Sequence, residues 1–199
     1  MAPVIPTVGD ALLIVDVQND FLPGGSLAVP AGDAILPALN AAIAVFTKQA
    51  LPIIATRDWH PVNHCSFKSQ GGQWPAHCVA GSEGAAFGAG LRIPNTTMVV
   101  SKATEPGADA YSGFDGTSLA TRLGSMEVKR LFVGGLATDY CVLETVCDAL
   151  KLGLGVVLLL DAIRPVDLRA GDGKAAIEKM AALGAVAVTS RDIGPASTA

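Results

Sequence analysis

The sequence predicts an α/β fold: a doubly wound, mainly parallel six-stranded sheet with helices on both faces, in a Rossmann-like three-layer arrangement. Six short runs rich in Val, Ile and Leu recur along the chain, and helical patterns separate them. The runs do not alternate apolar with polar residues, as strands with one wet face would, so we expect central parallel strands. A length of 199 residues suits one domain, and we expect residues 1–199 to form it.

The elements follow from these patterns in chain order. We expect strands at 11–17, 52–56, 97–101, 130–134, 155–160 and 185–189. The first expected helix is capped by Asp33 and places Ile35, Leu36, Leu39, Ile43 and Phe46 on one stripe. A second helix starts at Thr138 or Asp139 and runs to about Leu152, where Gly153 is a stop signal, and a third runs from Asp172 through Leu183 to Gly184.

Composition excludes several classes of protein. A net charge of -4 and the lack of any Lys/Arg run argue against nucleic-acid binding. Mean hydropathy is high at +0.44, but the most apolar run, 152–160, is far shorter than the ~20 residues of a spanning helix. We expect no membrane contact, no secretory signal and a cytoplasmic protein whose four cysteines are free thiols. The apolar surplus also favours a homo-oligomer.

Two connections are too long to be simple turns. Residues 18–32 follow the first strand and residues 58–96 follow the second. Loops of this length in compact domains are usually functional. In open parallel sheets, ligands bind beyond the carboxyl ends of the strands, so polar residues at those ends are the candidates for a site.

A carboxylate, an amine and a thiol stand at three of these ends. They are Asp16, Lys102 and Cys141. Cys141 would lie in the first turn of a helix, where N–H groups favour an anion, and Lys102 would add positive charge while Asp16 accepts the thiol proton. This set suits acyl transfer through a thioester. The alternative is a structural Asp16–Lys102 ion pair beside an inert thiol; Cys147 is interpreted as core packing.

A second group suits a metal ion. All three histidines, His60, His64 and His77, lie in the second long loop, close after Asp58. In an extended segment Asp58 and His60 point to the same side, and His77 can return to complete the set. Such ligands suit Zn²⁺, Fe²⁺ or Mn²⁺, with His64 as a ligand, an outer hydrogen-bond partner or an exposed residue. Histidines that only cap or bond within the loop are the alternative, and a structural zinc site using Cys65 and Cys78 is the lesser possibility.

Aromatic residues are scarce, at 5% of the chain, yet several lie in or beside these loops. Phe21 falls in the first loop; Trp59, Phe67 and Trp74 fall in the second. Loop aromatics often only pack locally, but here they flank the candidate ligands. They could hold a flat ring between them.

The chain resembles the isochorismatase-like cysteine hydrolases of the nicotinamidase/pyrazinamidase type. The resemblance covers nearly the whole chain and rests on five motifs in order: VDVQNDFLPGGSL (15–27), TRDWHPVNHCSF (56–67), WPAHC (74–78), SKATEPGADAYSGF (101–114) and GGLATDYCV (134–142). It implies that Asp16, Lys102 and Cys141 are catalytic and that Asp58, His60 and His77 bind the metal, with His64 as a possible further ligand. It also implies a cis peptide at Leu136–Ala137, which would turn the Ala137 N–H toward the oxyanion, and a ring pocket that includes Phe21, Trp74 and Tyr111.

The resemblance further implies deamidation of nicotinamide to nicotinate and ammonia, with pyrazinamide as a related substrate. The partner is a small aromatic amide. One divalent metal, with Zn²⁺ as the first expectation, would hold the ring nitrogen directly or through its water, and no nucleotide cofactor is implied. Two alternatives remain: a related Asp-Lys-Cys amidohydrolase acting on a carbamoyl or ureido amide, and a non-enzymatic binding domain on the same fold.

Overall fold

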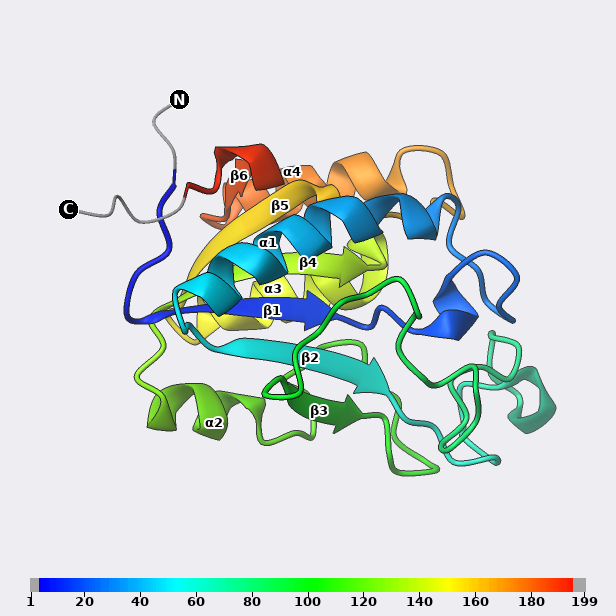
Figure 1. The fold of residues 1–199 in the computed structure, drawn as a ribbon. Helices are drawn as coiled ribbons and strands as arrows, with labels where there is room; N and C mark the ends of the chain where they lie inside the picture. Colours follow the sequence, from blue (N-terminus) through cyan, green and yellow to red (C-terminus); the bar gives the residue numbers. More distant parts are fainter. Residues whose placement is uncertain (1–3, 195–199) are drawn as a thin grey trace.

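The computed structural model describes residues 4–194, which build a six-stranded sheet with helices on both faces (Figure 1). The strands are β1 (Asp10–Val15), β2 (Ile53–Asp58), β3 (Met98–Lys102), β4 (Arg130–Leu136), β5 (Gly155–Arg164) and β6 (Val186–Val188). They are ordered β3-β2-β1-β4-β5-β6, and every neighbouring pair is parallel. The predicted fold class is therefore confirmed.

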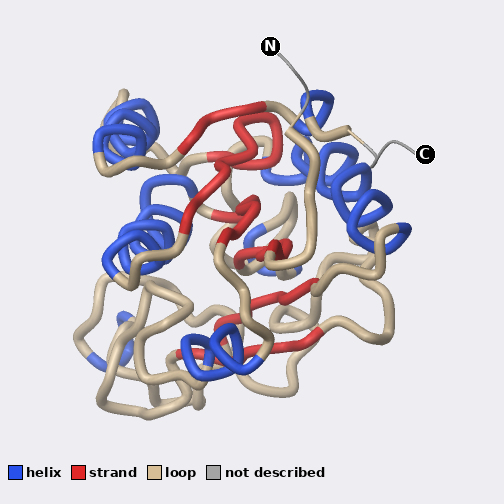
Figure 2. Tube along the Cα trace, turned by 90° about the vertical axis from the view of Figure 1, so that its left-hand side faces the viewer, coloured by secondary structure: helices blue, strands red, loops and turns tan. Residues whose placement is uncertain are grey.

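The sheet is apolar on both faces because a helix layer covers each one. Helix α1 (Leu36–Lys48) packs on one face, against Leu12, Ile14 and Phe132. Helices α2 (Leu119–Ser125), α3 (Leu143–Lys151) and α4 (Asp172–Ala182) contribute to the other hydrophobic cluster, which contains Leu13 and Val133. Figure 2 shows helices on either side of the strands. Burial on both faces explains why the strand sequences lack an alternating pattern.

The predicted cap at Asp33 is wrong. Asp33 is exposed in a 3₁₀ turn, Gly32–Ile35, and makes no capping hydrogen bond, while α1 begins one turn later at Leu36. The stripe expected on this helix is largely confirmed, since Ile35, Leu39, Ile43 and Phe46 are buried. The 3₁₀ turn carries the first of these apolar residues, so the hydrophobic pattern extends beyond the α-helix itself.

The other two helices agree with the predictions. A π-helical turn, Thr138–Val142, precedes α3, whose end is followed by Gly153 at a positive φ of 80°. Helix α4 starts at Asp172 and ends one residue before Leu183. Cys147 is buried on α3, as predicted, and all four cysteines are free. Helix α2, which the sequence analysis does not anticipate, precedes β4.

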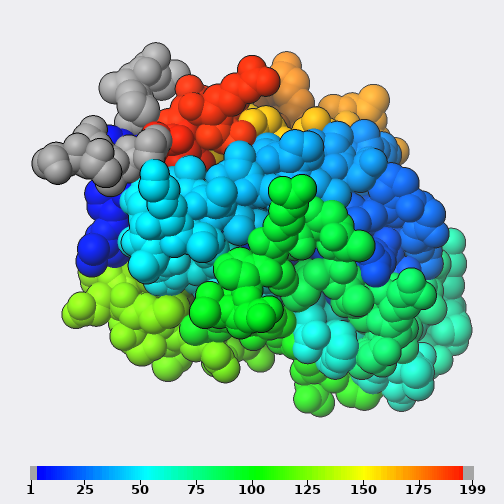
Figure 3. Space-filling view, viewed as in Figure 1, coloured from blue at the N-terminus to red at the C-terminus, as the bar shows by residue number. Residues whose placement is uncertain are grey.

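The order of the strands determines where a site can form. The chain moves outward from β1 through β2 to β3, then returns to the other side of β1 with β4. Open sheets bind ligands at such a reversal, beyond the carboxyl ends of the two central strands. Figure 1 shows the loops after β1 and β2 gathered at this end, and Figure 3 shows the green segment that leads to β3 crossing the surface below α1.

No helix within residues 4–194 is long and apolar enough to span a lipid bilayer.

Candidate active site

Four chemically reactive side chains lie at or beyond the carboxyl ends of strands β1 to β4. Asp16 comes directly after β1 with a positive φ of 50°, Asp58 and Lys102 are the last residues of β2 and β3, and Cys141 lies in the turn after β4. Parallel strands bring these ends to one edge of the sheet. All four residues are buried.

Asp16, Lys102 and Cys141 form one cluster. The Nζ of Lys102 is 3.0 Å from Oδ2 of Asp16 and donates to the Sγ of Cys141 at 3.4 Å. Oδ1 of Asp16 accepts a hydrogen bond of 2.7 Å from the hydroxyl of Thr56. The sulfur also lies within 4.8 Å of a carboxylate oxygen of Asp16. The structure thus brings together the three residues in which the sequence predicts nucleophilic chemistry.

Lys102 also joins this cluster to the predicted metal ligands. Its ammonium group donates a short hydrogen bond to Oδ1 of Asp58 and a second one, of 3.1 Å, to the carbonyl of Ala110. In the sequence, the residues of the thiol cluster and the expected metal ligands form two separate groups. In the structure, one buried ammonium group contacts both.

Burial and charge shift the protonation of the cluster. Burial raises the pKa of Asp16 above its usual value, and Lys102 only partly opposes this. Burial likewise raises the pKa of the Cys141 thiol well above its usual value, although Lys102 acts in the other direction. Burial opposes the charge on Lys102, but Asp16 and Asp58 outweigh it and raise the pKa of this amine. Burial therefore favours the neutral thiol of Cys141, and the carboxylate of Asp16 lies close enough to take its proton.

The three expected metal ligands are also assembled. One potential ligand atom each from Asp58, His60 and His77 lies within 4.8 Å of the others, and all three residues are buried. Nδ1 of His60 is 3.0 Å from the carbonyl of His77, and Nδ1 of His77 is 2.8 Å from the carbonyl of Pro75. A carbonyl can only accept, so both Nδ1 atoms carry hydrogen. A neutral ring with hydrogen on Nδ1 keeps a lone pair on Nε2, which is the arrangement that metal-bound histidines show.

The protonation of His60 also suits a metal. Burial lowers its pKa to about 4, even though Asp58 favours the charged form. The imidazole is therefore neutral near pH 7, and the neutral ring is the form that binds a cation. One carboxylate and two imidazole side chains form a donor set for which a divalent transition metal is suited.

His64 lies beside this group but has both ring nitrogens engaged. Nε2 is 3.1 Å from the carbonyl of Ala108, and Nδ1 is 2.8 Å from the hydroxyl of Ser66. Ligation of a metal by His64 would require at least one of these bonds to break. Among the described residues, no potential metal group includes Cys65 or Cys78.

An apolar pocket opens onto Cys141. The predicted ring residues Phe21, Trp74 and Tyr111 all line it, and Nε1 of Trp74 donates a hydrogen bond of 3.0 Å to the hydroxyl of Tyr111. The other lining residues are Leu27, Val29, Asp58, Ala137, Tyr140, Cys141 and Val166. Such a lining suits a small flat molecule with one polar group directed at the sulfur.

Four lining residues were not anticipated from the sequence. Tyr140 directly precedes the thiol, and its ring packs edge-on against Trp74 with centroids 5.3 Å apart. Leu27 and Val29 lie in the first long loop, whose length was the available signal. Val166 follows β5, and no motif of the sequence marks it.

Two further polar residues hold the site in place. Gln18 is fully buried, and its side-chain amide bonds both the N–H and the carbonyl of Asp58, each at 2.8 Å. The carboxylate of Asp20 accepts a 2.7 Å hydrogen bond from the N–H of Cys78, next to His77. Both belong to the first quoted motif, but only the contacts reveal what they support.

The peptide bond between Leu136 and Ala137 is cis, as the resemblance implies. Ala137 lines the pocket beside Cys141.

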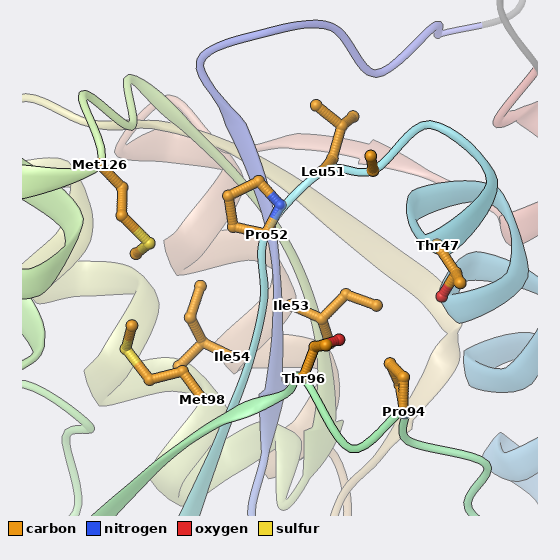
Figure 4. A pocket seen from close by; sticks show the side chains of 10 residues that line it. Thr47, Leu51, Pro52, Ile53, Ile54, Pro94, Thr96, Met98 and Met126 are labelled. Carbon is orange, nitrogen blue, oxygen red and sulfur yellow. The ribbon is translucent and has the colours of Figure 1, made fainter.

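A second cavity, of about 470 Å³, lies at the opposite ends of β2 and β3 (Figure 4). Pro52, Ile53, Met98 and Met126 are among the residues whose side chains surround it. The described residues that line this cavity include no acid, base or thiol, so the reactive chemistry belongs to the pocket at Cys141.

Comparisons with known proteins show which family the chain is similar to. The family pattern of the isochorismatase domain matches residues 10–192. A nicotinamidase of Escherichia coli (strain K12) is 41% identical over 203 residues, which cover 92% of this chain and 95% of that protein.

Solved structures show the same likeness. The pyrazinamidase of Pyrococcus horikoshii in complex with zinc matches with a TM-score of 0.87 and 47% identity, covering 91% of this chain and 99% of that one. The PnC1 protein of L. infantum in complex with nicotinate matches with a TM-score of 0.90 and 39% identity, covering 98% and 99%.

Proposed function

The chain belongs to the isochorismatase family, and from this premise we propose that it is a metal-dependent amidohydrolase that converts nicotinamide to nicotinate and ammonia. The observation that carries the proposal is the position of the Cys141 sulfur. It lies 3.4 Å from the Lys102 ammonium, close to Asp16, and at an aromatic-lined pocket. Pyrazinamide, which has a similar flat ring and the same carboxamide, is a second substrate.

The first half of the reaction forms a thioester. Asp16 takes the proton of the Cys141 thiol, and Lys102 stabilises the resulting thiolate. The sulfur attacks the carboxamide carbon, while the N–H groups of Ala137 and Cys141 donate to the oxyanion. The C–N bond then breaks, and the amide nitrogen leaves as ammonia with the proton from Asp16.

The second half regenerates the enzyme. A water molecule gives a proton to Asp16 and attacks the thioester carbon. The C–S bond breaks, nicotinate leaves, and the proton returns to the sulfur. One amide and one water are thereby converted to one acid and one ammonia, and the protein is unchanged.

Asp58, His60 and His77 would hold a divalent cation, for which Zn²⁺ is our first choice and Fe²⁺ or Mn²⁺ are alternatives. Their grouping, their burial and the free Nε2 lone pairs support this assignment. When bound, such a cation supplies positive charge that attracts the ring nitrogen of the substrate. The pocket walls, with Phe21, Trp74 and Tyr111, orient the ring so that its carboxamide meets Cys141.

The direct test is ammonia release by the wild type and by Cys141→Ala, with Cys147→Ala as the matched control. The panel is nicotinamide, pyrazinamide, N-carbamoylsarcosine and ureidoacrylate. We expect turnover of the first two by wild type and Cys147→Ala, and none by Cys141→Ala, whose circular dichroism should remain native.

Other results would change the proposal. Activity above a few per cent in Cys141→Ala would exclude the thioester. Turnover of only the carbamoyl or ureido compounds would favour the related amidohydrolase, and no turnover of any member by the metal-loaded protein would favour a binding domain.

Three wider expectations stay proposals. We propose a cytoplasmic protein, a single domain over residues 1–199 and a homo-oligomeric state. The first rests on the free thiols, the second on one continuous sheet and the third on the apolar surplus.

A further inference from the structure

Asp139 lies two residues before Cys141, in the turn that carries the thiol, and its side chain forms hydrogen bonds with a distant part of the chain. Its Oδ1 accepts a hydrogen bond from the N–H of Val166, and its Oδ2 accepts one from the N–H of Asp167, both at 2.9 Å. Each carboxylate oxygen thus holds one backbone N–H of the loop after β5. Hydrogen bonds from an ionised acceptor are the stronger kind.

The loop held in this way contributes one residue to the pocket. Val166 lines the pocket, and it is the only member of the described loop 165–171 that does so. Its side chain is half-buried and packs against the hydrophobic cluster that includes Phe21 and Ala137. The next four residues, 167–170, are exposed.

The far end of the loop is fastened separately. The carboxylate of Asp167 accepts a 2.7 Å hydrogen bond from the backbone N–H of Gly173. The carboxylate of Asp172 accepts a 3.0 Å hydrogen bond from the backbone N–H of Arg169. These bonds join the loop to the start of α4. Neither of them reaches Val166, so the contact on the pocket side depends on Asp139.

We propose that Asp139 is a positioning residue that fixes the width of the ring pocket by holding Val166 in its wall. The inference rests on the proposed function. Asp139 would act on substrate binding and leave the reactivity of the sulfur unchanged, since its carboxylate bonds the loop and not the Lys102 cluster. Asp139 thus connects the turn that contains Cys141 to the part of the pocket wall that contains Val166.

The test compares Asp139→Ala with Asp172→Ala, which removes a loop hydrogen bond that does not involve Val166. We expect Asp139→Ala to raise KM for nicotinamide about tenfold with little change in kcat, as for loss of an apolar contact made equally by substrate and transition state. Asp172→Ala should leave KM unchanged. Alkylation of Cys141 by iodoacetamide, a small probe without a ring, should proceed at the wild-type rate in both variants.

A double-mutant cycle tests whether Asp139 affects KM through Val166. Val166→Ala should raise KM by itself, and adding it to Asp139→Ala should raise KM no further, because both changes remove the same contact. Additive effects, an unchanged KM in Asp139→Ala, or slower alkylation of Cys141 in that variant would each overturn the proposal. If Asp139→Ala loses its native circular dichroism, Asp139→Asn replaces it, since the amide keeps only one of the two acceptors.

A readout without turnover separates this inference from the proposed function. Hydrogen exchange at the N–H groups of Val166 and Asp167 should be slow in wild type and fast in Asp139→Ala. Absence of nicotinamide turnover in wild type would refute the proposed function. Unchanged exchange in Asp139→Ala would refute the role of Asp139 whether or not the enzyme turns over.

Discussion

The ammonium group of Lys102 lies between the carboxylates of Asp16 and Asp58 and beside the sulfur of Cys141. Its side chain is fully buried, and a buried charge is stable only when it is paired and hydrogen-bonded. Two carboxyl groups on one amine leave an excess of negative charge in the site. A divalent cation at Asp58 would compensate it, so the lysine links the electrostatics of the metal site to those of the nucleophile.

The histidines differ in the lone pairs that they leave free, and this predicts which of them hold the metal. His77→Ala should lose the bound metal, because its Nε2 is free. His64→Ala should keep it, since both of its ring nitrogens already have partners. Metal content per chain, measured by inductively coupled plasma mass spectrometry after loading with Zn²⁺ and desalting, checks this.

The same result is expected at His60, which belongs to both of the potential metal groups that contain histidine. His60→Ala should behave as His77→Ala does. Loss of metal in His64→Ala with retention in His77→Ala would contradict the assignment and would place the ion between His60, His64 and Asp109.

At the level of single residues, the sequence predicts the reactive side chains better than it predicts the residues that hold them in place. Asp16, Lys102 and Cys141 are conspicuous because charged or nucleophilic residues are unusual at the ends of apolar strands. Gln18 and Val166 are not, because a glutamine or a valine in a loop has no distinctive chemistry. Gln18 acts through hydrogen bonds to Asp58, which lies 40 residues further along the chain. Val166 acts through its place in the wall of the pocket.

At the level of elements, β4 approaches β1 closely just before the site. Gly135 is paired with Val15 and has a φ of 134°, and a Cβ there would overlap the carbonyl oxygen of Val15. Strand β1 would have to move to admit a side chain. The same two strands carry Asp16 and Cys141 at their ends, so the spacing of the strands sets the spacing of the catalytic groups.

Gly135→Ala should therefore lower the free energy of unfolding by about 3 kcal/mol or more and reduce kcat, through overpacking and backbone strain. The control is Gly153→Ala after α3, which also has a positive φ, of 80°, but has open space where a Cβ would lie. It should cost only about 1 kcal/mol. Urea unfolding and ammonia release measure both effects, and equal losses in the two variants would refute the argument from close approach.

The elements that the sequence predicts are those with a strong local signal. All six strands are confirmed, because continuous apolar runs between turn residues leave few alternatives. Helix α2 has only seven residues, with Leu119 and Leu123 as its buried pair, too short a stretch for a helical period to emerge. The Asp33 cap fails because a 3₁₀ turn intervenes, and a 3₁₀ turn leaves no distinct mark in the pattern.

At the level of the whole molecule, the metal ligands connect the sheet to its longest loop. Asp58 ends β2, whereas His77 lies 17 residues beyond His60 in the 58–96 connection. The described segment has little regular structure, a single 3₁₀ turn at Lys68–Gln70 between β2 and β3. A cation bound by all three ligands would therefore act as a cross-link that closes this loop against the sheet.

Metal removal should accordingly destabilise the whole fold and not only stop turnover. At a free metal concentration about 100 times Kd, binding adds about 2.7 kcal/mol to the free energy of unfolding, which for a domain of this size is a Tm shift of about 5–10 °C. We expect a chelator to lower Tm by such an amount and to expose the 58–96 segment to limited proteolysis, with both effects reversed by Zn²⁺. The control is His77→Ala, whose Tm should already be low and should not respond to the chelator. A similar chelator response in that variant would show that the ion acts elsewhere, and the same Tm with and without metal in wild type would show that the loop needs no cross-link.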